Sequence, residues 1–240
     1  MRTITLSALF ALLAGCTGAE LAFSASARQE LVDTFEASVD VQQALAEYTF
    51  AASRGDLDLA GAVYTPPVGS MPGTLTIPGG TFPFGTGDLT IVFTAQGDGA
   101  YVDPYVTDLT TATNVMVVAD VVFTGTSNIG QAIAASADFT ATTVNNGLND
   151  VQATVNGVFD VDHGAYDFDF TATDVQMDLD LANDVVTNVL GNVNGTIDIP
   201  DFPYDADFTV DGLGATLDID IDAVVTTISY TLGLAELQAG

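Results

Sequence analysis

Apolar and polar residues alternate through most of residues 88–232, and this period of two constrains the fold more than any other feature. Successive side chains of a β-strand point to opposite faces, so the alternation predicts strands with one buried and one solvated face. Turn signals such as Gly97-Asp98-Gly99 and Asn145-Asn146-Gly147 divide the region into roughly eleven antiparallel strands. A sheet this wide has to curl into a half-barrel, close into a barrel or split into a sandwich. The predicted fold class is therefore mainly β, a wide curled antiparallel meander.

Part of this region is duplicated. Residues 155–181 and 193–219 align without a gap at an offset of 38, and 11 of the 27 aligned positions are identical. Each copy reads as strand, turn, strand, turn, strand. The apolar residues change from even to odd positions after Thr173 in the first copy, and a similar change falls at Asp211-Gly212 in the second. These changes of the apolar parity predict the second turn of each copy there. Between Ile221 and Val224 the parity changes without a turn residue, which predicts a bulge.

Two different segments precede the sheet. Apolar residues recur at helical spacing over residues 27–50, and Ser26 with Gln29 has the form of a capping box. We expect one N-terminal amphipathic helix that fills or caps the concave side of the sheet. Residues 61–87 then hold five of the eight prolines and seven glycines. Because proline removes a ladder donor, this segment is predicted to be irregular, with at most a short edge strand at residues 74–77.

The first residues have the form of an export signal. Arg2 is followed by an apolar run over residues 6–14, which is typical of a secretory signal peptide. Leu13-Ala14-Gly15-Cys16 resembles the lipobox of bacterial membrane lipoproteins. That resemblance implies cleavage before Cys16 and acyl chains such as palmitate on Cys16. It also implies an anchor in the outer membrane, because Thr17 rather than Asp follows the cysteine. The alternative is an ordinary secreted protein with a cysteine near its cleavage site.

This interpretation divides the chain into a signal peptide (residues 1–15), a lipidated cysteine with its tether (16–26) and a single β-rich domain (27–240). Two or more acyl chains are enough for stable anchoring. Cys16 is the only cysteine, so the folded part is expected to be stabilised by packing rather than by disulfides. The sequence leaves open which side of the outer membrane the domain faces.

Acidic residues dominate the charge, with 32 Asp and Glu against 3 Lys and Arg and a net charge of −29 at pH 7. A surface of this sign repels nucleic acids and anionic lipid headgroups, so binding to either through charge is not expected. Rows such as Asp218, Asp220 and Asp222 alternate with apolar residues and are expected on the solvated face. Their mutual repulsion suggests a fold adapted to saline or divalent-rich surroundings.

One segment is a candidate metal site. Asp160-Val161-Asp162-His163-Gly164 resembles the start of an Asp-x-Asp-x-Asp-Gly calcium loop, with carboxylates beside a turn. Gly164 replaces the third acid, however, and no glutamate stands at the twelfth place. Asp160 and Asp162 are therefore candidate Ca²⁺ ligands, and no other cofactor is expected.

Few enzyme classes fit the sequence. His163 is the sole histidine and is predicted to be a turn residue, without a serine nucleophile motif beside it. Phosphate loops, dinucleotide-binding glycines and Cys/His clusters are missing from the sequence. Two carboxylates at the distance needed for glycoside hydrolysis remain possible among so many aspartates. The chain also lacks Trp and ends in Gln238-Ala239-Gly240, which does not favour a transmembrane β-barrel.

Three functional hypotheses follow. The first is a lipid-anchored envelope protein with a non-catalytic binding or structural β-domain. One helix against a curled sheet resembles the lipoprotein carrier and acceptor proteins of the outer membrane, which implies an apolar ligand. A concave face filled by Leu31, Phe35 and Val39 would instead favour a structural role. The second is a Ca²⁺-dependent surface adhesin or matrix module, and the third is an enzyme resembling glycoside hydrolases.

Overall fold

The computed structural model describes residues 25–55, 57, 61–145, 150–180, 185–200, 205–222 and 227–234. These residues form helix α1 (Ala25–Arg54), a short 3-10 turn (Leu109–Thr111) and twelve strands. The strands are β1 (Val63–Thr65), β2 (Gly73–Phe82), β3 (Gly85–Gly97), β4 (Ala100–Val102), β5 (Asn114–Ser127), β6 (Ala132–Asn145), β7 (Asp150–His163), β8 (Tyr166–Asp180), β9 (Val185–Asp198), β10 (Ala206–Gly214), β11 (Thr216–Asp222) and β12 (Thr227–Gly233).

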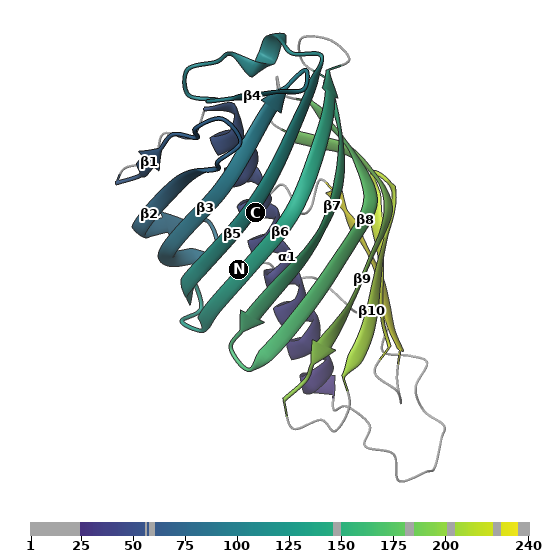
Figure 1. Ribbon diagram of the computed structural model, residues 1–240. Coiled ribbons are helices and arrows are strands. Elements are labelled where there is room, and N and C mark those ends of the chain that lie inside the picture. The colour runs from purple at the N-terminus through teal and green to yellow at the C-terminus, as the bar shows by residue number, and fades with distance from the viewer. Residues whose placement is uncertain are drawn as a thin grey trace.

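All strands belong to one antiparallel meander, which confirms the predicted fold class. The sheet order is β1-β2-β3-β5-β6-β7-β8-β9-β10-β11-β12, and β4 pairs with β3 beside this path. Within the described part of the chain, β1 and β12 lie at opposite ends and do not pair with each other. The sheet is therefore an open half-barrel. Figure 1 shows α1 running along the concave side of the curled sheet.

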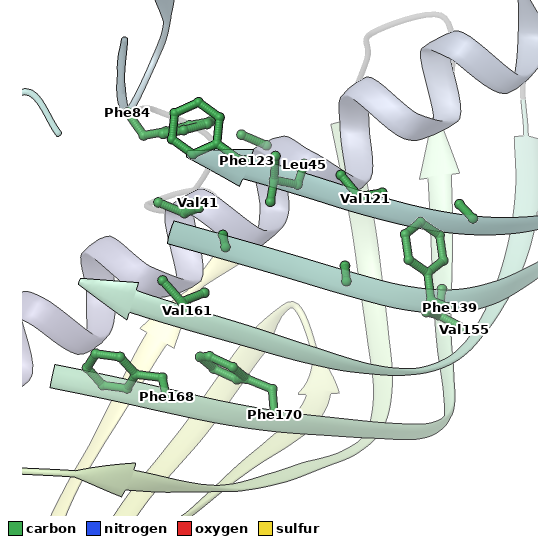
Figure 2. Packing of buried hydrophobic residues seen from close by; sticks show 14 of the residues in the cluster. Val41, Leu45, Phe84, Val121, Phe123, Phe139, Val155, Val161, Phe168 and Phe170 are labelled. Carbon is green, nitrogen blue, oxygen red and sulfur yellow. The ribbon is translucent and has the colours of Figure 1, made fainter. Parts of the chain in front are cut away.

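Helix α1 fills the concave side with its apolar face. Leu31, Phe35 and Leu45 are each 0% exposed, and Val39 is partly buried against the same core. The ring of Phe35 lies 6.0 Å from that of Phe168 on β8 and 5.0 Å from that of Phe208 on β10. Figure 2 shows Val41 and Leu45 of the helix among the inward side chains of the strands. Full burial of one such side chain stabilises the fold by about 1.5–3 kcal/mol.

The helix is longer than residues 27–50. It begins at Ala25, so Ser26 lies inside the helix and is not its N-cap as predicted. Gly55, with a φ of 73°, ends the helix, and its N–H donates to the carbonyl of Ala52 at 3.0 Å. This is the usual role of glycine after a helix, because glycine adopts the left-handed conformation without a Cβ clash.

The prediction of an irregular segment over residues 61–87 is wrong, because β1, β2 and the start of β3 lie there. Most of its prolines occupy the loops between these strands. Pro78 lies inside β2, where the register with β3 shifts between Ile77 and Gly80. The next backbone amide, that of Gly79, donates to the carboxylate of Asp88 at 2.7 Å and not to a backbone carbonyl of the neighbouring strand. A bulge therefore accommodates the missing proline donor.

Two predicted turns are also wrong. After Thr173, β8 continues through a bulge in which Asp174 has a φ of 50°. Asn156 on β7 holds this bulge, because its amide Nδ2 donates to the carboxylate of Asp174 and its Oδ1 accepts from the amide of Asp174. Asp211 and Gly212 lie inside β10.

The end of the sheet differs from the prediction as well. Where a bulge was predicted between Ile221 and Val224, the chain forms two antiparallel strands, β11 and β12, with Asp222 opposite Thr227. The link between them lies outside the described residues.

The two copies of the repeat consequently fold differently. The first covers most of β7 and all of β8, whereas the second covers the end of β9, all of β10 and the start of β11. The hairpin between β10 and β11 follows Gly214, which has a φ of 92°. The equivalent residue in the first copy is Gln176, for which such a φ would be strained, and β8 continues through it.

Candidate functional site

Pairs of aspartates face each other across neighbouring strands on the outer, convex side of the sheet. The β7–β8 ladder places Asp160 opposite Asp169 and Asp162 opposite Asp167. The β8–β9 ladder places Asp167 opposite Asp198 as well. Directly opposite residues have Cβ atoms about 4.5–5.5 Å apart, closer than the roughly 7 Å between alternate residues along one strand. The register between strands therefore gathers carboxylates that lie apart along the chain.

Three of these carboxylates lie close enough together to share one metal ion. Asp160, Asp167 and Asp169 can each offer an oxygen such that these atoms all lie within 4.8 Å of one another. Calcium binds oxygen at about 2.3–2.6 Å, so two ligands on opposite sides of one ion lie up to about 5 Å apart. The three carboxylates can thus reach a single Ca²⁺. They supply three of its six to eight oxygen ligands at minimum, and water or further carboxylate oxygens would have to supply the rest.

The local electrostatics favour a positive charge in this cluster of Asp160, Asp167 and Asp169. Burial, followed by repulsion from Asp160, Asp162, Asp169 and Asp198, raises the pKa of Asp167 to about 6. Burial and the charges of Asp162 and Asp169 also raise the pKa of Asp160. One oxygen of Asp167, Oδ1, is buried and accepts no hydrogen bond from the described residues. A bound cation would satisfy this oxygen and offset the repulsion.

A shallow hollow of about 330 Å³ adjoins the cluster on the same face. Asp160 and Asp169 line one side of it, and Asp120 and Asp138, which face each other across β5 and β6, line the other. Val158 and Thr171 are also part of its lining. The hollow widens the region of negative potential beyond the three-carboxylate cluster.

The structure places the two predicted metal ligands, Asp160 and Asp162, in different surroundings. Asp160 belongs to the cluster, but Asp162 is exposed opposite Asp167 and is not one of the three clustered ligands. Both residues lie in β7, and the turn begins only at Gly164, so residues 160–164 do not form a calcium loop. Sequence reasoning missed Asp167 and Asp169 as partners of Asp160. The signal in the sequence is the hairpin turn, which the structure places at Gly164-Ala165, because this turn sets the register that pairs them.

His163 does not contribute to this site. It is the last residue of β7 and is 1% exposed, so its prediction as a turn residue is wrong. Its parity along β7 is that of the buried Val161, which directs it to the inner face and away from Asp160 and Asp162. Neither ring nitrogen has a hydrogen-bond partner among the described residues, and burial lowers the pKa of His163. The imidazole is accordingly a neutral part of the core.

Cys16, the predicted lipid attachment site, lies outside the described residues. Among the residues that are described, no helix combines the length and hydropathy needed to cross a bilayer. In comparisons with protein-family models, curated proteins and solved structures, none matches this chain.

Proposed function

We propose that the chain is a lipid-anchored, non-catalytic protein of the cell envelope whose β-domain has a structural role. The observation that carries the structural role is the packing of α1, which occupies the concave side of the sheet. The lipobox residues Leu13-Ala14-Gly15-Cys16 support the anchor and an outer-membrane location.

The filled concave side favours a structural role over carriage of an apolar ligand. In an open half-barrel, the concave face is the surface that would enclose such a ligand. Here Leu31 and Phe35 are fully buried against it, and Tyr48 packs on Phe82 of β2 with ring centroids 5.4 Å apart. A ligand at this place would have to displace the helix, and the core of the domain with it.

The proposed anchor would hold this domain close to the bilayer. Residues 16–24 connect Cys16 to the start of α1 at Ala25. Nine fully extended residues span at most about 30 Å. The N-terminal end of the helix, next to the anchor in the chain, would therefore remain within this distance of the membrane surface.

The anchor is tested by expressing the chain and its C16S variant in a bacterial host that processes lipoproteins, with radiolabelled palmitate. We expect wild type to be labelled and to sediment with the membranes, and C16S to be unlabelled and soluble. Absence of label from wild type, or equal fractionation of both chains, would contradict the anchor. The structural role is tested by organic extraction of the purified C16S chain followed by mass spectrometry. Recovery of a stoichiometric apolar compound would contradict it.

A second candidate function is a Ca²⁺-dependent surface module. The specific observation is the cluster of Asp160, Asp167 and Asp169, with its buried Asp167 oxygen. The experiment is calorimetric titration of the C16S chain with CaCl₂. We expect saturable heat for wild type, and its loss in D167N.

The matched control for this titration is D220N. Asp220 is exposed and lies between Thr209 and Ser229, with no carboxylate directly opposite. Removing its charge lowers the total negative charge as D167N does, without touching the cluster. If wild type gives no heat, or if D220N loses the signal as D167N does, the calcium module is contradicted.

A further inference from the structure

The two edges of the sheet differ in how open they are to another strand. β1 has only three residues and is followed by Pro66 and Pro67. β12 pairs with β11 over all seven of its residues, and no described strand lies on its other side. Proteins usually protect such an edge with lysine, proline, a bulge or an inward charge. β12, with the sequence Thr-Ile-Ser-Tyr-Thr-Leu-Gly, has none of these.

The absence of charge on β12 matters in a chain with a net charge of −29. The neighbouring strand β11 carries Asp218, Asp220 and Asp222. If two copies pair through β12, their β11 strands lie three strand spacings apart, about 14 Å. This exceeds the Debye length of about 8–10 Å near physiological salt, so the two carboxylate rows are largely screened from each other. The uncharged edge strand thus separates the acidic rows of two copies.

The pattern of β12 is also complementary to itself. Ile228 and Leu232 are buried on the inner face, whereas Ser229 and Thr231 are exposed on the outer face. An antiparallel pairing with a two-fold axis at Tyr230 sets Ile228 opposite Leu232 of the second copy and Ser229 opposite Thr231 of the second copy. Apolar residues then meet apolar residues inside the joined sheet, and hydroxyls meet hydroxyls outside it. A two-fold contact of this kind closes on itself.

We propose that the chain forms a symmetric homodimer in which β12 of each copy pairs antiparallel with β12 of the other. The two half-barrels then share one continuous sheet, held by main-chain hydrogen bonds as in other cases of strand addition. Pairing of β12 with β1 of another copy is less favourable, because β1 offers three residues before Pro66. This inference does not depend on the lipid anchor or on Ca²⁺.

Cysteine cross-linking tests the register. In the full chain with C16S, the single-cysteine variants S229C and T231C are prepared separately, one of them with a size tag, then mixed and oxidised. Residues 229 and 231 of different copies are directly opposite, within the roughly 4.4–6.8 Å between Cα atoms that a disulfide spans. Two copies of residue 229 lie diagonally about 8 Å apart, too far for a disulfide.

We therefore expect a disulfide between S229C and T231C chains and little from either variant alone. V63C, at the exposed edge strand β1, is the control and is expected to give no cross-link. No cross-link in the mixture, equal cross-linking of V63C, or efficient cross-linking of S229C alone would overturn the proposed dimer.

A matched pair of lysine substitutions tests the dimer without oxidation. Asp220 on β11 is flanked by Ser229 on β12 and by Thr209 on β10. S229K and T209K each place a lysine beside the same carboxylate, but only S229K lies on the open edge. By sedimentation of the full C16S chain, we expect S229K to raise the dimer dissociation constant at least tenfold and T209K to change it less than twofold. A monomeric parent chain at about 100 µM, or equal effects of both lysines, would overturn the proposal.

Discussion

Asp160 on β7 and Asp169 on β8 lie directly opposite each other on the outer face of the sheet. The same arrangement recurs across the sheet, in pairs whose carboxylates share one face: Asp120 with Asp138, Asp162 with Asp167, Asp167 with Asp198, Asp207 with Asp222, and Asp211 with Asp218. Like charges directly opposite each other destabilise a sheet. The core beneath these pairs must therefore supply the stability that the outer face lacks.

Replacing Asp167 should remove a carboxylate whose charge is disfavoured by burial and by four neighbouring aspartates. Folding raises the pKa of Asp167 from an ordinary value near 4 to about 6. Between these values the folded chain binds more protons than the unfolded chain, so the contribution of Asp167 to stability is present at low pH and is lost as the pH rises through about 6. At pH 7.5 we expect D167N to raise Tm by about 2–4 °C, corresponding to about 1 kcal/mol. Calorimetric scans at pH 7.5 and 5.5 without calcium measure this, and D220N should change Tm much less.

His163 should give the opposite dependence on pH. Burial lowers its pKa in the folded chain, so the unfolded chain takes up a proton first as the pH falls. The stability that His163 contributes is fully present above pH 6.5 and is lost as the pH falls below this value. We expect H163L to resist acidification between pH 7 and 5.5 better than its parent, measured by urea midpoints. Both chains carry D167N, so that Asp167 does not mask the effect. Equal losses in both chains would contradict a neutral, buried His163.

The sequence predicts the main features of this fold because alternation is a local property. A period of two identifies strands and assigns faces, and the alternating residues Phe168 and Phe170 accordingly lie in the core. It does not distinguish a turn from a bulge, since both change the parity. At Asp174 the chain forms a bulge and not a turn because Asn156, a residue on another strand, accepts a hydrogen bond from the bulged backbone. No local pattern contains that contact.

The candidate site was only half predicted for a similar reason. Spacing along one strand predicts that alternate residues such as Asp167 and Asp169 lie about 7 Å apart, too far for one ion, but their carboxylate oxygens lie within 4.8 Å of each other and of Asp160. The three-carboxylate cluster forms because the register of the β7–β8 hairpin places Asp160 opposite Asp169. Register depends on the length and type of the turn, so Asp167 and Asp169 are identified as partners of Asp160 only once the turn is placed.

Phe35 should be the residue of α1 on which the helix–sheet packing depends most. Its ring contacts Phe168, Phe170 and Phe208 with centroids 6.0, 6.1 and 5.0 Å away. Truncation leaves a cavity between helix and sheet, so we expect F35A to lower the free energy of unfolding by about 3–5 kcal/mol. Q29A, on the exposed side of the same helix, should cost less than about 0.5 kcal/mol in the same urea titration. A small effect of F35A would contradict the packing of α1 in the concave face.

Gly195 and Gly157, equivalent positions of the repeat, should both resist substitution by alanine. A Cβ at Gly195 would overlap the ring of Phe208 on β10 and the carbonyl oxygen of Asp169 on β8. At Gly157 it would overlap Phe139 on β6. We expect G195A and G157A each to lower the free energy of unfolding by about 1–3 kcal/mol, as overpacking does. N194A, beside Gly195 but exposed, is the control. Tolerance of both alanines would contradict the close contact of the Phe208 ring with Gly195 and of Phe139 with Gly157.

Salt should stabilise the whole domain, because the facing aspartates repel through solvent-exposed space. The Debye length falls from about 10 Å at 0.1 M to about 3 Å at 1 M, which is shorter than the separation of the opposed side chains. We expect Tm to rise by several degrees between 0.1 and 1 M NaCl at pH 7.5. Salt also strengthens apolar burial in general, so D160N/D167N is measured in parallel. Its Tm should be higher than that of wild type in dilute buffer and should rise less with salt, since three facing pairs have lost a charge. A Tm that is unchanged in molar salt, or an equal rise in both chains, would contradict adaptation of this acidic face to saline surroundings.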